Sequence, residues 1–194
     1  MKTTAYLAAA ITLALATAAQ AQTTGSEVQR NVDQQQRIEQ GLQSGSLTTH
    51  EAAKLEQGEA HIDKMQSNAL KDGTLSPAEK ARIQKAQNAE SRAIYKDKHN
   101  AHVGNPASAS SQRMQKDVQR DINQQARIKQ GVSSGQLTKR ETASLEHGQA
   151  RVNHKEAVAG ADGHVGAAEQ ARVQNAENVQ SDRIYRKKHN VAAE

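Results

Sequence analysis

The side chains in this sequence that are best suited to chemistry are carboxylates in four short motifs. Each motif reads Gly-x-apolar-x-x-x-Glu, at residues 45–51, 73–79, 135–141 and 163–169. In a calcium-binding EF-hand loop, Gly, an apolar residue and Glu occupy the sixth, eighth and twelfth positions. The pattern makes a divalent metal ion a candidate ligand. The carboxylates that would bind it are Asp72, Glu79, Asp162 and Glu169.

The same motifs also fit a junction between two helices. A Gly just after an apolar stripe can adopt the left-handed conformation that ends a helix. A hydroxyl residue followed by Glu three positions later is a capping box for the next helix. No motif has an acid at the first or third position of the EF-hand frame, where calcium prefers carboxylates. We therefore interpret the motifs as capped junctions and keep metal binding as the alternative. The predicted capping pairs are Thr48 with Glu51, Ser76 with Glu79 and Thr138 with Glu141.

Two further candidate sites lie in the tails Tyr-x-x-Lys-His-Asn, at residues 95–100 and 185–190. Of the eight histidines, only His99 and His189 stand at matching places in the two tails. Imidazole is a ligand for Cu²⁺, Zn²⁺ or Ni²⁺, so both are candidate metal ligands. A tyrosine flanked by cations could instead bind a partner, and positive residues also stabilise helix C-termini. The candidate partner-binding residues are Tyr95, Lys98, His99, Tyr185, Lys188 and His189.

Other catalytic and binding patterns are missing. The chain has no Cys, which excludes disulfides, thiolate metal sites and a cysteine nucleophile. It has no glycine-rich phosphate loop, no nucleophile elbow and no HExxH motif. No isolated carboxylate pair stands out in an apolar setting, and most acids have a nearby cation at helical spacing. We expect no enzyme and no cofactor. The net charge of +5 is spread among 21 acids, which disfavours nucleic acid as a partner.

The elements that must position these residues come from an internal duplication. Residues 28–100 align without a gap with residues 118–190, with many identities. Apolar residues recur at helical spacing in three segments of each copy. The sequence therefore predicts an all-α fold of two tandem three-helix units joined by a flexible linker. The expected divisions are a first repeat at 22–100, a linker at 101–117, a second repeat at 118–190 and a tail at 191–194.

The first 21 residues are typical of an export signal. Lys2 precedes an apolar run from Tyr6 to Ala18, and Ala19-Gln20-Ala21 fits the small-x-small cleavage rule. We expect cleavage after Ala21 and a periplasmic or secreted protein. No later segment of the sequence is apolar enough to span a membrane.

The motifs together resemble a family of small exported proteobacterial helical-repeat proteins of unknown function, with a local, degenerate similarity to EF-hand loops. This resemblance implies a periplasmic address and a helical fold, and it implies no reaction. We expect a non-enzymatic periplasmic binding or stress-associated protein, with an envelope protein or a second copy as partner. The alternatives are a weak divalent-metal binder and a structural or oligomeric envelope component.

Overall fold

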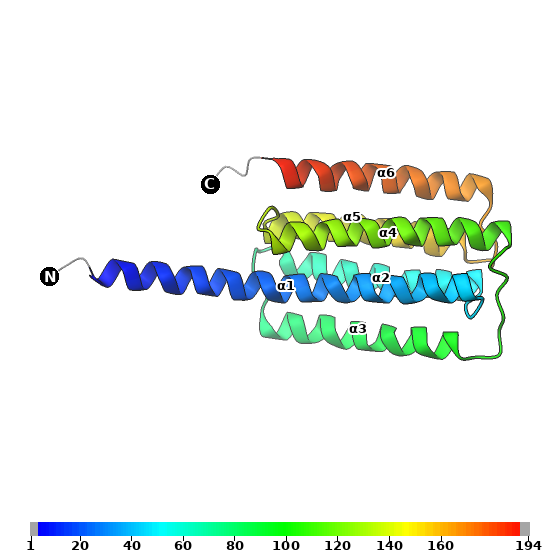
Figure 1. Ribbon diagram of the computed structural model, residues 1–194, viewed down its shortest axis with the longest axis horizontal. Coiled ribbons are helices and arrows are strands. Elements are labelled where there is room, and N and C mark those ends of the chain that lie inside the picture. Colours follow the sequence, from blue (N-terminus) through cyan, green and yellow to red (C-terminus); the bar gives the residue numbers. More distant parts are fainter. Residues whose placement is uncertain (1–3, 191–194) are drawn as a thin grey trace.

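The computed structural model describes residues 4–190, with side chains described from residue 24 onward. This part of the chain contains six α-helices and no strand, which confirms the predicted all-α class (Figure 1). The helices are α1 (Thr4–Ser44), α2 (Thr49–Leu70), α3 (Pro77–Lys98), α4 (Ala109–Ser133), α5 (Lys139–Ala159) and α6 (Ala167–His189).

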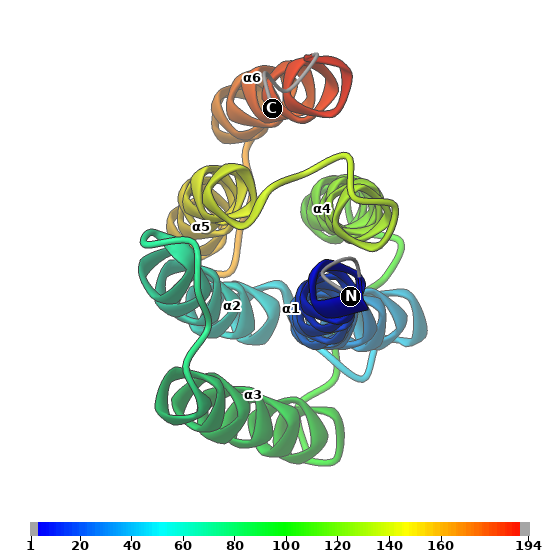
Figure 2. The same cartoon turned by 90° about the vertical axis from the view of Figure 1, so that its left-hand side faces the viewer.

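Four of these helices form a central bundle. Viewed from the end, α1, α2, α4 and α5 occupy its corners, while α3 and α6 lie on opposite outer sides (Figure 2). The most extensive contacts join α2 to α5 and α1 to α4, and each of these pairs links one repeat to the other. The sequence left open whether the repeats pack together, and the structure gives them one shared core.

The apolar core also draws on both repeats. Ile38, Leu55 and Met114 belong to one cluster of buried side chains, whereas Val28 and Leu145 belong to a second. The interior positions in the middle of the bundle helices are polar instead. They carry the buried residues Asn31, Gln35, Glu56, Glu59, Asp63, Gln66, Asp121, Gln125, Glu146, Gln149, Asn153 and Glu156.

The junction interpretation of the four motifs is confirmed. Their first residues, Gly45, Gly73, Gly135 and Gly163, have φ angles of 75°, 87°, 74° and 87°, in the left-handed region where glycine is favoured. All three predicted capping boxes are present, at the starts of α2, α3 and α5. Before α6, Gly166 has no side chain with which to cap the helix.

The segment between the repeats differs from the expected flexible linker at 101–117. Helix α4 already begins at Ala109, because the Ser108 hydroxyl accepts the Ser111 N–H at 3.1 Å and caps it. The rest of the segment is attached to the α1–α2 turn. The Gly104 N–H donates to the Gly45 carbonyl at 2.8 Å, and His102 Nδ1 lies 2.7 Å from Glu51 Oε1 at the start of α2. The segment between the helices is therefore shorter than the predicted linker, and hydrogen bonds hold it against the α1–α2 turn.

The predicted export signal, with cleavage after Ala21, falls within residues 1–23, whose side chains the structure does not describe. Residues 1–3 and the predicted tail at 191–194 lie outside the described residues altogether. The export signal stays a prediction. Across the helices that are described, none is both long and apolar enough to cross a membrane.

A shared core predicts that one substitution destabilises both repeats together. We expect Leu55→Ala, at a position that is 2% exposed, to lower the free energy of unfolding by about 2–5 kcal/mol. Val158→Ala, at a position that is 61% exposed, should change it by less than about 0.5 kcal/mol. Urea unfolding followed by circular dichroism should show one transition for each protein, whereas two transitions would contradict a shared core.

Candidate functional site

Three buried carboxylates meet in the polar middle of the bundle. Glu56 lies on α2, Asp121 on α4 and Glu156 on α5, so the group draws on both repeats. One oxygen atom from each lies within 4.8 Å of the others, and the residues are 0%, 0% and 1% exposed. We call this group the inner carboxylate site.

Most oxygen atoms of the inner carboxylate site lack a well-formed hydrogen bond: both oxygens of Asp121, both of Glu156 and Oε1 of Glu56. The side chains of Gln149 and Glu156 approach Asp121 and offset part of the effect of burial on its pKa. The remaining oxygen, Glu56 Oε2, accepts the amide of Gln35 at 2.8 Å. Buried polar atoms in folded proteins are nearly always hydrogen-bonded, so such a group of exceptions needs a physical explanation.

No positive side chain neutralises this site from within. The buried residues that the structure describes include no Lys, Arg or His. A fourth carboxylate, Glu177 on α6, adds negative charge beside Asp121 and Glu156 and raises the pKa of both. Glu177 itself is paired with Arg120, whose Nη1 lies 3.1 Å from Glu177 Oε2.

Burial therefore disfavours the ionised forms. It raises the pKa of Glu56 to about 8 and that of Glu177 to about 8. Burial also raises the pKa values of Asp121 and Glu156 well above their usual range, and neighbouring carboxylates raise both further. At neutral pH the site must hold protons or bind a cation, because unpaired buried charges are strongly destabilising.

The duplication supplies an internal comparison for this site. A shift of 90 residues along the sequence takes Glu56 to Glu146, but it takes Asp121 to Asn31, Glu156 to Gln66 and Glu177 to Gln87. We call these four matching residues the amide cluster. Glu146 is thus acidic like Glu56, whereas the other three residues of the amide cluster are amides with nearly the same shape as the acids that they match.

The amides satisfy one another as carboxylates cannot. The Asn31 amide donates to Gln66 Oε1 at 2.7 Å and to Asp63 Oδ1 at 2.8 Å. The Gln87 amide donates in turn to Asn31 Oδ1 at 2.7 Å. Ionised carboxylates accept hydrogen bonds only, so the same positions in the inner carboxylate site lack this network.

The ligand atoms of the inner carboxylate site indicate which metals it could hold. Carboxylate oxygens suit hard cations such as Mg²⁺, Ca²⁺ and Mn²⁺. Imidazole, which suits Cu²⁺, Zn²⁺ and Ni²⁺, is not available in the interior, because all eight histidines are exposed. Oxygens bound at about 2.0–2.6 Å from one ion lie within about 5 Å of each other, which the observed spacing satisfies.

The carboxylates predicted from the loop motifs lie elsewhere and have structural partners. Asp72 Oδ1 accepts the Thr74 N–H at 2.8 Å, and Asp162 Oδ1 accepts the His164 N–H at 2.9 Å. Glu79 Oε2 accepts the Ser76 N–H at 2.9 Å as half of its capping box. These bonds stabilise turns and helix starts.

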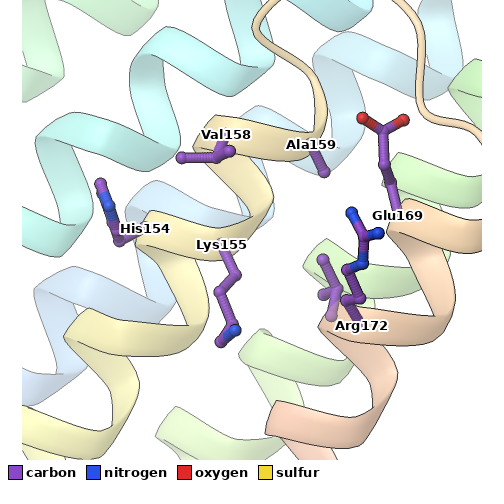
Figure 3. A pocket seen from close by; sticks show the side chains of 7 residues that line it. His154, Lys155, Val158, Ala159, Glu169 and Arg172 are labelled. Carbon is purple, nitrogen blue, oxygen red and sulfur yellow. The ribbon is translucent and has the colours of Figure 1, made fainter.

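The fourth predicted carboxylate, Glu169, lines a pocket of about 290 Å³ between the end of α5 and the start of α6 (Figure 3). Its Oε2 accepts the Gly166 N–H at 2.8 Å. Lys155 and Arg172 line the same pocket, so positive side chains rather than further oxygen ligands accompany this carboxylate.

The two tails form matching ends of α3 and α6. Tyr95 stacks on His99 with ring centroids 4.1 Å apart, and Tyr185 stacks on His189 at 4.2 Å. Each histidine Nδ1 lies 2.7 Å from the carbonyl oxygen of its tyrosine. Lys188 Nζ donates to Gln130 Oε1 at 2.8 Å. In the first tail, Lys98 Nζ donates to the Arg37 carbonyl at 3.2 Å.

Within the described residues, neither tail histidine joins a group of three potential metal ligands. Both tyrosines remain exposed, at 61% and 59%. Partner binding by the two tails stays a prediction, because no partner surface is part of the structure.

Sequence reasoning missed the inner carboxylate site. The sequence shows no isolated carboxylate pair there, because Glu56, Asp121 and Glu156 come from three separate helices and meet only in the folded bundle. One signal was available. Aligning the repeats exposes exchanges between an acid and its amide at 121/31, 156/66 and 177/87, where shape is kept and charge changes.

The raised pKa values predict that the metal-free protein loses stability as pH rises. A carboxyl group whose folded pKa is raised to about 8, as for Glu56, stabilises the fold fully below about 4.5 and loses that contribution as pH rises through 8. The pKa of Glu51 is instead lowered to about 2, because hydrogen bonds that include those of the Thr48 N–H and the His102 ring outweigh burial. Ionisation of Glu51 therefore changes the stability at a more acidic pH than this interval.

We therefore expect the melting temperature in EDTA to fall by several degrees between pH 5 and pH 8, measured by circular dichroism. Glu156→Gln removes one of these groups and should make the fall smaller. A melting temperature that rises over this interval would contradict the assignment of these carboxyl groups to the interior.

Comparison with known proteins adds no further assignment to this geometry. No family model matches the chain, and neither the curated proteins searched nor the solved structures searched contain a match. The resemblance to small exported proteobacterial proteins stays a prediction. The candidate site therefore rests on the geometry of the buried carboxylates and on the contrast between the two repeats.

Proposed function

We propose that this protein binds a hard divalent cation inside its four-helix bundle, at Glu56, Asp121 and Glu156. The observation that carries the proposal is the contrast between two repeat-related groups in one interior. Hydrogen bonds join the amides of the amide cluster, which leaves two buried oxygens without a partner, Gln87 Oε1 and Glu146 Oε1. In the inner carboxylate site five buried oxygens lack a well-formed hydrogen bond. A cation would compensate these oxygens and their charge together.

The composition of the site supports a cation such as Mn²⁺, Ca²⁺ or Mg²⁺. Three carboxylates supply oxygen ligands only, and Glu177 adds a fourth negative charge beside them. Because burial raises the pKa values of these groups, a cation must displace protons when it binds. We therefore expect the affinity to increase as pH rises from 6 to 8.

This proposal keeps the binding role expected from the sequence and changes its location. The metal ligands move from the loop motifs to the interior, while the function remains binding without an assigned reaction. Together with the predicted export signal, it describes a periplasmic or secreted cation-binding protein. Competition for divalent metal in the envelope would connect such a protein to stress.

Calorimetric titration of the metal-stripped protein with Mn²⁺ at pH 7.5 tests the proposal. We expect one ion per chain, because the described residues contain one such three-carboxylate group. Glu156→Gln should weaken binding by at least about ten-fold, since it replaces a ligand by the amide that the first repeat carries.

The matched control is Glu146→Gln, which makes the same change in the amide cluster of the same bundle. It should leave the affinity within about three-fold of the original, because it removes no ligand of the inner carboxylate site. Binding that is absent from the original protein, or equally weakened in both variants, would contradict the proposal.

The amide cluster also offers a gain of function. Asn31→Asp combined with Gln66→Glu rebuilds, around Glu146, the three carboxylates of the inner carboxylate site. We expect the Mn²⁺ stoichiometry to rise from one to two, with a metal-free protein that melts at a lower temperature at pH 7.5. Equilibrium dialysis gives the stoichiometry. A stoichiometry that stays at one would show that three carboxylates in this architecture are not sufficient.

A further inference from the structure

A second pair of acids lies between α2 and α3, on the side of Glu56 away from the second repeat. Glu59 is 1% exposed, and both of its carboxylate oxygens are buried without a hydrogen-bond donor. Glu90 Oε1 is likewise buried without a donor. Glu59 follows Glu56 by three residues on α2, which places both on one face of the helix.

Gly58 allows Glu90 to come this close. A Cβ atom on Gly58 would overlap the carboxylate of Glu90, so only glycine lets this side chain from α3 reach the backbone of α2. A glycine within a helix costs about 1 kcal/mol relative to alanine, and the close approach of Glu90 is what this position provides.

A surface groove leads to Glu90, the outer acid of the pair. It has a volume of about 450 Å³, and Gly58 and Glu90 line it together with residues of α2 and α3. Its rim also carries the exposed Arg82 and Lys85. Attraction of a cation into the groove must therefore come from Glu90, the one carboxylate in its lining.

The second repeat again supplies the comparison. Gly148 approaches Gln180 as closely as Gly58 approaches Glu90, but Gln149 and Gln180 carry amides where the first repeat carries Glu59 and Glu90. The Gln180 amide donates to the Leu145 carbonyl at 2.8 Å, so a hydrogen bond joins α6 to the α5 backbone at this place. The first repeat keeps the same backbone approach with two acids and no such bond from Glu90.

We propose that Glu59 and Glu90 form an outer subsite for hard divalent cations, through which an ion passes from the α2–α3 groove over Gly58 to the inner carboxylate site. This inference rests on the proposed function, because it assigns the route to that same site.

The charges of the neighbouring acids agree with a continuous path. After burial, the charge of Glu90 and then that of Glu56 are the largest causes that raise the pKa of Glu59. Glu59 is thus electrostatically connected with the groove on one side and with the inner carboxylate site on the other.

Stopped-flow loading of the metal-stripped full-length protein with Mn²⁺ tests the route. Glu90→Gln introduces the residue that the second repeat carries at this place, and we expect it to slow loading by at least about ten-fold. Its equilibrium affinity for the first ion should stay within about three-fold, because the ligands of the inner carboxylate site are unchanged. The matched control is Asp182→Asn, which removes the same charge from the exposed face of α6, outside the groove, and should leave the rate within about two-fold.

The possible results separate the two proposals. Slow loading with retained affinity in Glu90→Gln, and normal loading in Asp182→Asn, supports the route. Unchanged loading in Glu90→Gln, or equal slowing in both variants, overturns the route and leaves the proposed function intact. A protein that binds no Mn²⁺ at equilibrium overturns both.

Discussion

The interior of this bundle gathers carboxyl groups with no buried cationic side chain among residues 24–190, and folding has to neutralise them. Glu56, Asp121 and Glu156 are almost completely removed from water, and most of their oxygens lack a well-formed hydrogen bond. Protons can neutralise such groups at acidic pH, but the ionised forms are strongly disfavoured in an interior without compensating charge. A bound cation removes this conflict near neutral pH, so metal binding and stability are coupled in this account.

The duplicated architecture makes this arrangement possible. The two repeats pack against each other through α1 with α4 and α2 with α5, so matching positions face a common interior. Exchange between Asp and Asn, or between Glu and Gln, changes charge with little change in shape. The protein thereby carries a largely hydrogen-bonded amide cluster around Asn31 and a largely unsatisfied acidic site around Asp121 within one core. The same kind of exchange distinguishes Glu59 and Glu90 from Gln149 and Gln180.

Local features of the fold could be predicted from the sequence. The four glycines with positive φ and the capping boxes at Thr48, Ser76 and Thr138 depend on residues a few positions apart, so their patterns are visible in one chain. The contacts between the repeats and the anchoring of Gly104 on the Gly45 carbonyl depend on distant partners, and periodicity does not reveal them.

The candidate site was hidden for the same reason. Each acid by itself fits the polar face of an amphipathic helix, and cations at helical spacing make it look solvated. Only the packing of α2, α4 and α5 turns these faces inward. The loop acids Asp72 and Glu79 matched a known metal-binding pattern, yet in the structure they bond to Thr74 and Ser76.

The most direct measurement is an anomalous difference map from crystals of the protein grown with Mn²⁺. The account predicts a peak in the middle of the bundle, within about 2.0–2.6 Å of carboxylate oxygens from Glu56, Asp121 and Glu156. A well-ordered bundle in which manganese occupies only the loop acids or the surface histidines would contradict it.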